Sequence, residues 1–271
     1  LRGFEDHAKI PPHPLSSEEM APASRQKSEL SRRSFLFAAA PWLLQPGAAS
    51  ARRRLELAGL PWIHIRNGSA PLRLLRIHGN EETAREAVEL VIEDTPGEAW
   101  IVDSPIRHVT LGGLRLDPNR MFSRAGAERN LRLLNPEARP ELIAALLDQL
   151  DRGRDTLMKT IAPPPGGLWI AAHNNGPGYS IETEAPISQR IHKPQPESPR
   201  DFFLFTSAAD FEIALKGPYN AVLQDRPGGE DDGSLSRWCA ARGVRYVNAE
   251  AAQGKLDRQL EMLRWLIAAL P

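Results

Sequence analysis

Two residues near position 80 have the types and spacing of metal ligands. His78 and Glu81 form an H-x-x-E pair that follows the apolar residues 72–77 and precedes a helical pattern. Imidazole nitrogen and carboxylate oxygen both bind zinc, and a catalytic zinc ion typically takes three protein ligands and leaves one position for water. The pair therefore offers two ligands for a hydrolytic metal site, and a third must come from elsewhere.

Two further candidates follow apolar segments later in the chain. His173 comes after residues 168–172, and Glu250 comes after residues 244–249. Open α/β sheets bind ligands at the carboxyl ends of their strands. Taken singly, each has a plain explanation, a hydrogen-bonded loop histidine or a surface carboxylate. Their shared position at strand ends is what indicates one site.

A third polar group lies in the segment 117–122, DPNRMF. Asn119 and Arg120 can hold a substrate carboxylate, because a guanidinium forms a bidentate clamp and the amide adds a donor. The alternative is an ordinary turn, since Asp-Pro-Asn is favourable turn chemistry whatever its function.

The spacing of apolar residues predicts the elements that position these side chains. Alternate and consecutive apolar residues over 72–77 predict a buried strand, and helical spacing over 84–91 predicts a helix. Gly79 permits the sharp turn between them, and Asn80 is the expected helix cap.

The same reasoning gives a coarse map of the remaining chain. Further strands are expected at 55–66 (one or two, around Pro61), 99–102, 109–116 (interrupted at Gly112 and Gly113), 168–172, 202–205, 221–223 and 244–249. Helices are expected at 125–134, 136–151, 208–215 and 234–242, with an amphipathic helix at the end of the chain. The proline-rich residues 176–199 predict loops with a short strand at 179–183.

Length and composition narrow the class of protein. The 271 residues, 41% of them apolar, can form a single domain with one sizeable core. The 34 basic and 34 acidic residues are interspersed, which argues against nucleic-acid binding. The single cysteine, Cys239, lies in an apolar run and is expected to be a packed thiol, not a catalytic one.

Residues 1–51 are expected to lie outside the folded domain, which then comprises 52–271. Residues 31–36, SRRSFL, are similar to a twin-arginine export signal, followed by a short apolar run and a small-x-small pattern ending at Ala51. The run is too short to span a bilayer, so no stable membrane anchor is expected. We therefore expect contact with the twin-arginine export machinery, cleavage near Ala51 and a periplasmic or secreted product. Met20 is an alternative translation start.

The motifs HGNE and DPNRMF, with His173 and Glu250 following in order, resemble the zinc carboxypeptidase superfamily. The nearer likeness is to its compact branch, which includes succinylglutamate desuccinylase and aspartoacylase. This resemblance covers most of residues 72–251 and implies an α/β fold: a single compact domain with a mixed central β-sheet flanked by helices.

The resemblance also implies roles for these residues. His78, Glu81 and His173 would hold one Zn²⁺ per chain, while Glu250 would handle the proton. Asn119 and Arg120 would bind the substrate carboxylate. The superfamily also uses an arginine that polarises the scissile carbonyl, for which Arg107 and Arg115 both qualify, and a pocket tyrosine, for which Tyr179 and Tyr219 both qualify.

The expected activity is zinc-dependent hydrolysis of an amide next to a free carboxylate, with a small molecule or peptide as substrate. N-acylamino acids and peptide C-termini both meet this requirement, and an exported enzyme makes a murein-peptide amidase one alternative. A second alternative is a non-catalytic protein that binds a carboxylate ligand on the same fold. A serine α/β-hydrolase is disfavoured because the sequence lacks G-x-S-x-G.

Overall fold

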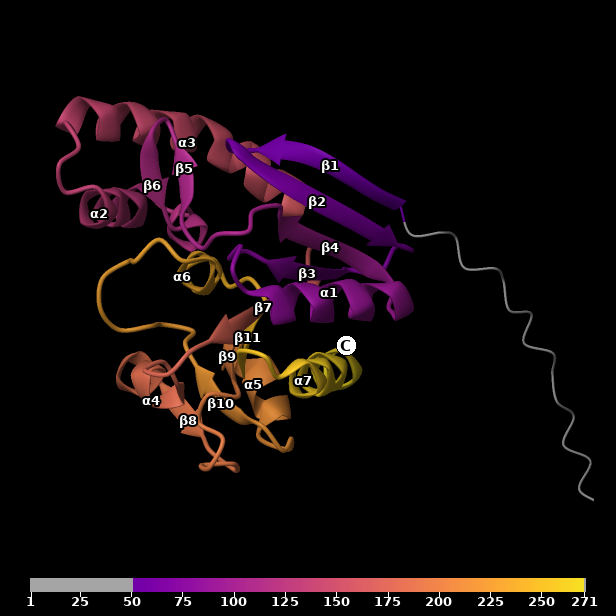
Figure 1. The fold of residues 1–271 in the computed structure, drawn as a ribbon. Helices are drawn as coiled ribbons and strands as arrows, with labels where there is room; N and C mark the ends of the chain where they lie inside the picture. The colour runs from indigo at the N-terminus through magenta and orange to yellow at the C-terminus, as the bar shows by residue number, and fades with distance from the viewer. Residues whose placement is uncertain (1–50, 271) are drawn as a thin grey trace, which may run out of the picture. The chain divides into compact units, whose positions relative to one another are not determined.

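The computed structural model describes residues 51–270, in which a mixed nine-stranded sheet lies between two layers of helices (Figure 1). The expected fold class is confirmed. The strand order is β1-β2-β4-β3-β7-β11-β9-β10-β8. The strands are β1 (Ala51–Leu57), β2 (Leu60–Asn67), β3 (Leu72–Arg76), β4 (Gly97–Val102), β7 (Leu168–Asn175), β8 (Arg190–His192), β9 (Phe202–Phe205), β10 (Asn220–Leu223) and β11 (Tyr246–Ala252).

The four central strands, β4, β3, β7 and β11, are parallel to one another. Strands β1, β2 and β9 join this group through antiparallel pairing, and β10 pairs parallel to β9 but antiparallel to β8. Parallel strands place their carboxyl ends at one edge of a sheet. The segments that leave β3, β7 and β11 therefore meet at that edge.

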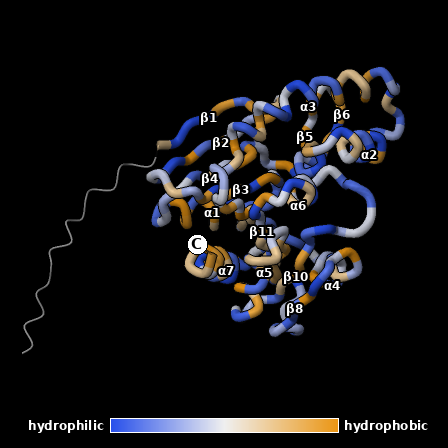
Figure 2. The backbone as a smooth tube through the Cα atoms, turned by 180° about the vertical axis from the view of Figure 1, so that it is seen from behind, coloured by the Kyte–Doolittle hydropathy of each residue, from blue (hydrophilic) through white to orange (hydrophobic). Residues whose placement is uncertain are grey.

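Each face of the sheet has its own hydrophobic core. Helices α1 (Glu82–Asp94), α5 (Ala208–Ala214) and α7 (Leu256–Ala269) pack on one face. Helices α2 (Arg124–Leu134), α3 (Pro140–Ile161) and α6 (Leu235–Ala240) pack on the other, with the hairpin of β5 (Val109–Leu111) and β6 (Leu114–Leu116). Figure 2 shows hydrophobic positions recurring along the strands, whereas the connecting loops are mainly hydrophilic.

Several predicted boundaries differ from the structure. The helix expected at 136–151 begins later and runs further, because Pro140 occupies its first turn and the buried face continues to Ile161. The segment 109–116 forms a separate two-stranded hairpin and does not join the main sheet. Residues 176–199 contain α4 (Ile181–Glu184), a 3₁₀ turn (Ala185–Ile187) and β8, where loops and a strand at 179–183 were expected.

The junction between β3 and α1 also corrects the sequence interpretation. Glu81, not Asn80, occupies the cap position of α1, and its own side chain does not cap the helix. The side chain of Asn174 does this instead, since its Oδ1 accepts a hydrogen bond from the backbone N–H of Ala84 at 2.7 Å. Gly79 is required for space, not for a left-handed backbone. A Cβ at this position would lie 2.2 Å from the carbonyl oxygen of Ile106 and 2.5 Å from that of Ser104.

The predicted export signal, its apolar run and the alternative start at Met20 lie outside the described residues. The expected cleavage near Ala51 falls at the first residue of β1. No helix within residues 51–270 combines the length and apolar character needed to span a membrane. Cys239 is buried on α6, as expected, and burial raises the pKa of its thiol well above the usual value.

Candidate metal centre

His78, Glu81 and His173 form one buried cluster. One potential ligand atom from each residue lies within 4.8 Å of the other two. Glu81 Oε1 is 2.8 Å from Nδ1 of His78, and Glu81 Oε2 is 3.1 Å from Nδ1 of His173. The structure therefore brings together three residues that are separated by up to 95 positions in the sequence, from His78 to His173.

The elements explain this convergence. His78 is the second residue after β3, and Glu81 is the cap residue of α1. His173 lies within β7, which continues for two residues beyond it, so it does not end the strand as expected. Side chains alternate along a strand, and Trp169 and Ala171 pack on the α2–α3–α6 face. His173 shares that face.

Asp117 holds the second nitrogen of His78. Its Oδ1 is 2.8 Å from His78 Nε2, and the carboxylate is buried. Asp117 also accepts a hydrogen bond from the backbone N–H of Asn119 at 2.8 Å, which fixes the turn. Metal-binding histidines are commonly oriented in this way by a carboxylate on the other ring nitrogen. The sequence around Asp117 indicates only a turn and gives no sign of this contact.

The carboxylates of the cluster favour positive charge on its imidazoles. Burial opposes a charge on His78, but the carboxylates of Glu81 and Asp117 outweigh burial and raise the pKa of His78 to about 9. Burial likewise opposes ionisation of both acids, but the imidazoles hold the pKa of Glu81 below its usual value, and His78 with Arg107 does the same for Asp117. Both acids are therefore carboxylates at neutral pH.

A fully buried arginine supports the loop that carries the cluster. Arg76 donates hydrogen bonds to the carbonyl oxygens of Gly79 and Glu81, and to that of Val102 at 2.8 Å. Its guanidinium thus joins the H-x-x-E loop to the end of β4. Nothing in the strand pattern around Arg76 distinguished it from an ordinary exposed arginine.

Glu250 lies beside the cluster. On β11 it pairs in register with His173 on the parallel strand β7. Its carboxylate accepts hydrogen bonds from Asn175 Nδ2 and Asn248 Nδ2, both at 3.1 Å. Burial raises the pKa of Glu250, and the nearby Glu81 raises it further against the opposing effect of His173. A carboxylate with a raised pKa is a better proton acceptor.

Asn119 and Arg120 lie on a 3₁₀ turn (Pro118–Arg120) at another side of the same cavity. The Oδ1 atom of Asn119 accepts a hydrogen bond from the backbone N–H of Leu235 at 3.1 Å, which attaches the turn to α6. One Arg120 nitrogen donates to the carbonyl oxygen of Asn119 at 2.9 Å, and the other is 3.7 Å from Asp232. The guanidinium is held within the cavity wall.

The structure distinguishes between the two arginines left open by the sequence. Arg107 lines the cavity, 3.2 Å from Glu81 Oε1 and 3.5 Å from Asp117 Oδ2. Arg115 is an exposed residue of the β5–β6 hairpin, and its guanidinium is 3.0 Å from His108 Nδ1. Arg107 is the arginine positioned to contact a ligand at the cluster.

The structure also distinguishes between the two candidate pocket tyrosines. Tyr179 lines the cavity, whereas Tyr219 packs against Phe203 and Trp265 in the core on the opposite face.

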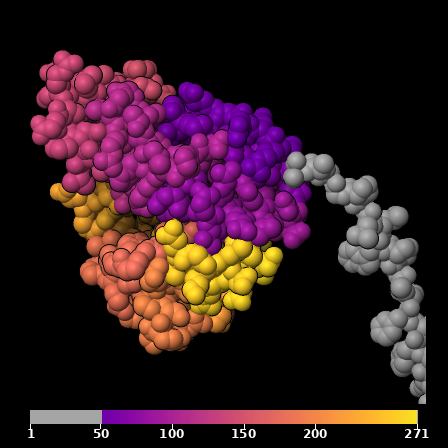
Figure 3. Space-filling view, in the orientation of Figure 1, coloured from indigo at the N-terminus to yellow at the C-terminus, as the bar shows by residue number. Residues whose placement is uncertain are grey.

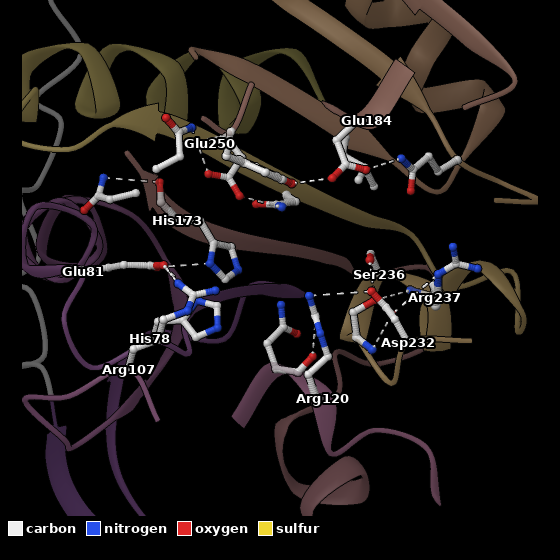
Figure 4. A pocket seen from close by; sticks show the side chains of 18 of the residues that line it. His78, Glu81, Arg107, Arg120, His173, Glu184, Asp232, Ser236, Arg237 and Glu250 are labelled. Atoms are coloured by element: carbon white, nitrogen blue, oxygen red, sulfur yellow. Dashed lines mark hydrogen bonds and ion pairs between the residues drawn. The ribbon is translucent and has the colours of Figure 1, made fainter. Parts of the chain in front are cut away.

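The cavity has a volume of about 330 Å³ (Figure 4). The residues described above that line it include His78, Glu81, Arg107, Asn119, Arg120, His173, Tyr179 and Glu250. His78, Glu81, Arg107 and Arg120 belong to the first half of the described chain, and Glu184, Asp232, Arg237 and Glu250 to the second. Figure 3 shows that these halves, coloured indigo to magenta and orange to yellow, form opposite sides of the folded unit. The cavity has the size of a small-molecule site.

The donor set fits a zinc ion. It comprises two imidazoles and one carboxylate, all buried and mutually close, and Asp117 orients one of the imidazoles. His173 Nε2 is buried and has no hydrogen-bond partner within residues 51–270, so this ring has unused capacity as a ligand. The two imidazoles disfavour ions such as Mg²⁺, which prefer oxygen ligands.

Comparisons with known proteins gave matches in structure only. No family model and no curated protein matches the sequence. The structure is similar to a succinylglutamate desuccinylase/aspartoacylase from Rhodobacter sphaeroides (14% identity, TM-score 0.43, 82% of this chain and 65% of that one). It is also similar to the murein-tripeptide amidase MpaA from Escherichia coli O157 (18% identity, TM-score 0.43, 83% of this chain and 90% of that one).

A third similar structure is an aspartoacylase family protein from Mesorhizobium loti (17% identity, TM-score 0.43, 83% of this chain and 67% of that one). This chain covers just under two thirds of the length of the Rhodobacter protein.

Proposed function

We propose that the protein is a zinc-dependent hydrolase that cleaves an amide bond next to a free carboxylate. The single observation that carries this proposal is the buried cluster of His78, Glu81 and His173 with Glu250 beside it. Three ligands and an adjacent unligated carboxylate are the parts of a catalytic zinc site, whereas a structural zinc site is closed by four ligands.

A bound zinc ion would supply an acidified water molecule and polarise the amide carbonyl. Glu250 accepts the proton of the attacking water and then donates it to the departing amine nitrogen. Arg107 is placed to donate hydrogen bonds to the carbonyl oxygen as negative charge develops there. Asn119 and Arg120 hold the substrate carboxylate, which fixes the amide relative to Glu250.

N-acylamino acids and peptide C-termini both satisfy this arrangement, as would a murein-derived peptide. We also propose that the enzyme is exported, on the basis of the twin-arginine pattern at residues 31–36. A non-catalytic carboxylate-binding protein is the competing function. The buried Glu250, with its raised pKa beside a ligand cluster, favours the enzyme.

The test is hydrolysis of a panel of N-acylamino acids and short peptides by the zinc-loaded protein. We expect cleavage of members with a free carboxylate, loss of cleavage after chelation, and recovery on adding zinc. If the protein binds panel members but cleaves none with zinc present, the non-catalytic alternative is correct.

A further inference from the structure

Glu184 is a cavity carboxylate that forms no ion pair with a basic side chain of residues 51–270. It is the last residue of α4, is half-buried and lines the cavity. Among the ion pairs formed within residues 51–270, none involves Glu184. A half-buried carboxylate in a cavity wall attracts a cationic group on a ligand when no basic side chain is paired with it.

The Glu184 carboxylate is held in a fixed orientation. Oε1 accepts a hydrogen bond from the hydroxyl of Tyr179 at 2.6 Å, and Oε2 accepts one from Gln224 Nε2 at 2.7 Å. Both donors are neutral, so they orient the carboxylate without cancelling its charge. Figure 4 shows Glu184 in the cavity wall, away from the cluster of His78 and Glu81.

The arginines and Asp232 of the cavity wall form ion pairs with groups of opposite charge. Glu250, beside the metal ligands, forms none within residues 51–270. Arg107 pairs with Glu81 and Asp117, and Asp232 lies between Arg120 at 3.7 Å and Arg237 at 3.5 Å. The Arg120 side therefore carries an excess positive charge, and the Glu184 side carries a negative one. A ligand with both a carboxylate and a cationic group would match both sides.

Two other roles for Glu184 lead to different expectations. As a general base it would need to reach the water near His173, but its two oxygens are occupied by Tyr179 and Gln224, and Glu250 is the carboxylate paired with the strand of His173. As a purely structural residue it would give the cavity no preference for ligand charge.

We propose that Glu184 is a recognition site for a cationic group on the substrate. The amino acid released by hydrolysis then carries two features: a carboxylate bound by Asn119 and Arg120, and a side-chain ammonium or similar cation bound by Glu184. This inference rests on the proposed function, because it assigns the substrate class of the same site. Basic amino acids acylated on the α-nitrogen are the simplest substrates of this class.

The experiment compares matched substrates on the zinc-loaded protein. Nα-acetyl-L-lysine and Nα-acetyl-L-ornithine carry the cation, whereas Nα-acetyl-L-norleucine and Nα-acetyl-L-norvaline have the same chain lengths without it. We expect the wild type to prefer the basic member of each pair in kcat/KM by about tenfold or more, a coupling of about 1.4 kcal/mol. In Glu184→Gln, which keeps the side-chain shape, the ratio should fall to about one. Glu184→Asp should retain part of the preference.

Glu182→Gln is the matched control, because Glu182 is an exposed acid on the same helix that pairs with Lys193 and does not line the cavity. It should keep the wild-type ratio. Calorimetric Kd values for the same four acetylated amino acids, measured with the Glu250→Gln protein, provide a readout that does not depend on turnover. We expect the basic member of each pair to bind more tightly than the neutral one.

The outcomes separate the two claims. If the wild type cleaves the neutral substrates as well as the basic ones and Glu184→Gln changes neither ratio nor Kd, the Glu184 inference is overturned and the hydrolase proposal stands. If zinc-loaded protein neither binds nor cleaves any substrate, both are overturned.

Discussion

Glu250 and His173 are register partners on the parallel strands β11 and β7. Because strand side chains alternate between faces, the backbone pairing itself places the proposed proton acceptor next to a metal ligand. Two residues that are far apart in sequence are thus held side by side by backbone pairing in the centre of the sheet. The central sheet therefore determines this part of the site, whereas loops supply Arg107 and the turn with Arg120.

Glu250→Gln should lower kcat by about 10²- to 10⁴-fold, because the amide keeps the shape but removes proton transfer. Zinc content and substrate Kd should change little, since the metal ligands and the carboxylate clamp are separate residues. The measurements are kcat, bound zinc and calorimetric Kd on the same preparation. Hydrolysis at the wild-type rate would show that Glu250 is structural.

Asp117→Asn should weaken zinc binding by about 10- to 100-fold without abolishing it, because the variant loses the charge that orients His78 but keeps all three ligands. Competition with a chromophoric chelator measures the affinity. Asp103→Asn is the control, since Asp103 pairs with the exposed Arg54. Equal zinc affinity in both variants would contradict this role.

Arg120→Ala should lower kcat/KM by about 10- to 100-fold, the range for a charge-assisted hydrogen bond. Discrimination between substrates with free and amidated carboxylates should also be lost. Arg115→Ala removes an exposed guanidinium from the β5–β6 hairpin and should leave both properties unchanged. The clamp would be misassigned if Arg120→Ala still rejected amidated substrates as strongly as the wild type.

The metal-free protein should become less stable as pH rises from about 6.5 to about 9. The folded-state pKa of His78 is about 9 against an ordinary value of 6.5, so its stabilising contribution is complete below the lower value and is lost as pH rises through the higher one. Urea unfolding in a chelating buffer measures this trend. The fall in the free energy of unfolding with pH should be smaller in His78→Gln. An equal fall in both proteins would show that His78 is not its source.

Much of the site could be predicted because its residues are tied to recognisable local patterns. The apolar run before His78 and the helical spacing after Glu81 define a strand-to-helix junction, and this kind of junction carries functional residues in α/β sheets. The apolar segments before His173 and Glu250 likewise identified two central strands, although both strands extend past those residues.

Other parts depended on contacts that no local pattern encodes. Asp117 reads as a turn residue until the fold places its carboxylate 2.8 Å from His78. Arg76 sits in a strand where an exposed side chain is the ordinary expectation, and only the packing of two loops around it makes it fully buried. Glu184 lay in a segment predicted to be loops beside the site, and no local pattern indicated that its carboxylate is held by Tyr179 and Gln224 in the cavity wall.

The most direct test of the central claim is the zinc content of the purified protein and of two ligand variants, measured by elemental analysis after dialysis. The wild type should contain about one zinc ion per chain, and His78→Ala and His173→Ala should each retain almost none at neutral pH, because two ligands hold zinc too weakly. His192→Ala, a change on the edge strand β8, should keep the wild-type content. Undiminished zinc in both ligand variants, or none in the wild type after loading, would contradict the assignment.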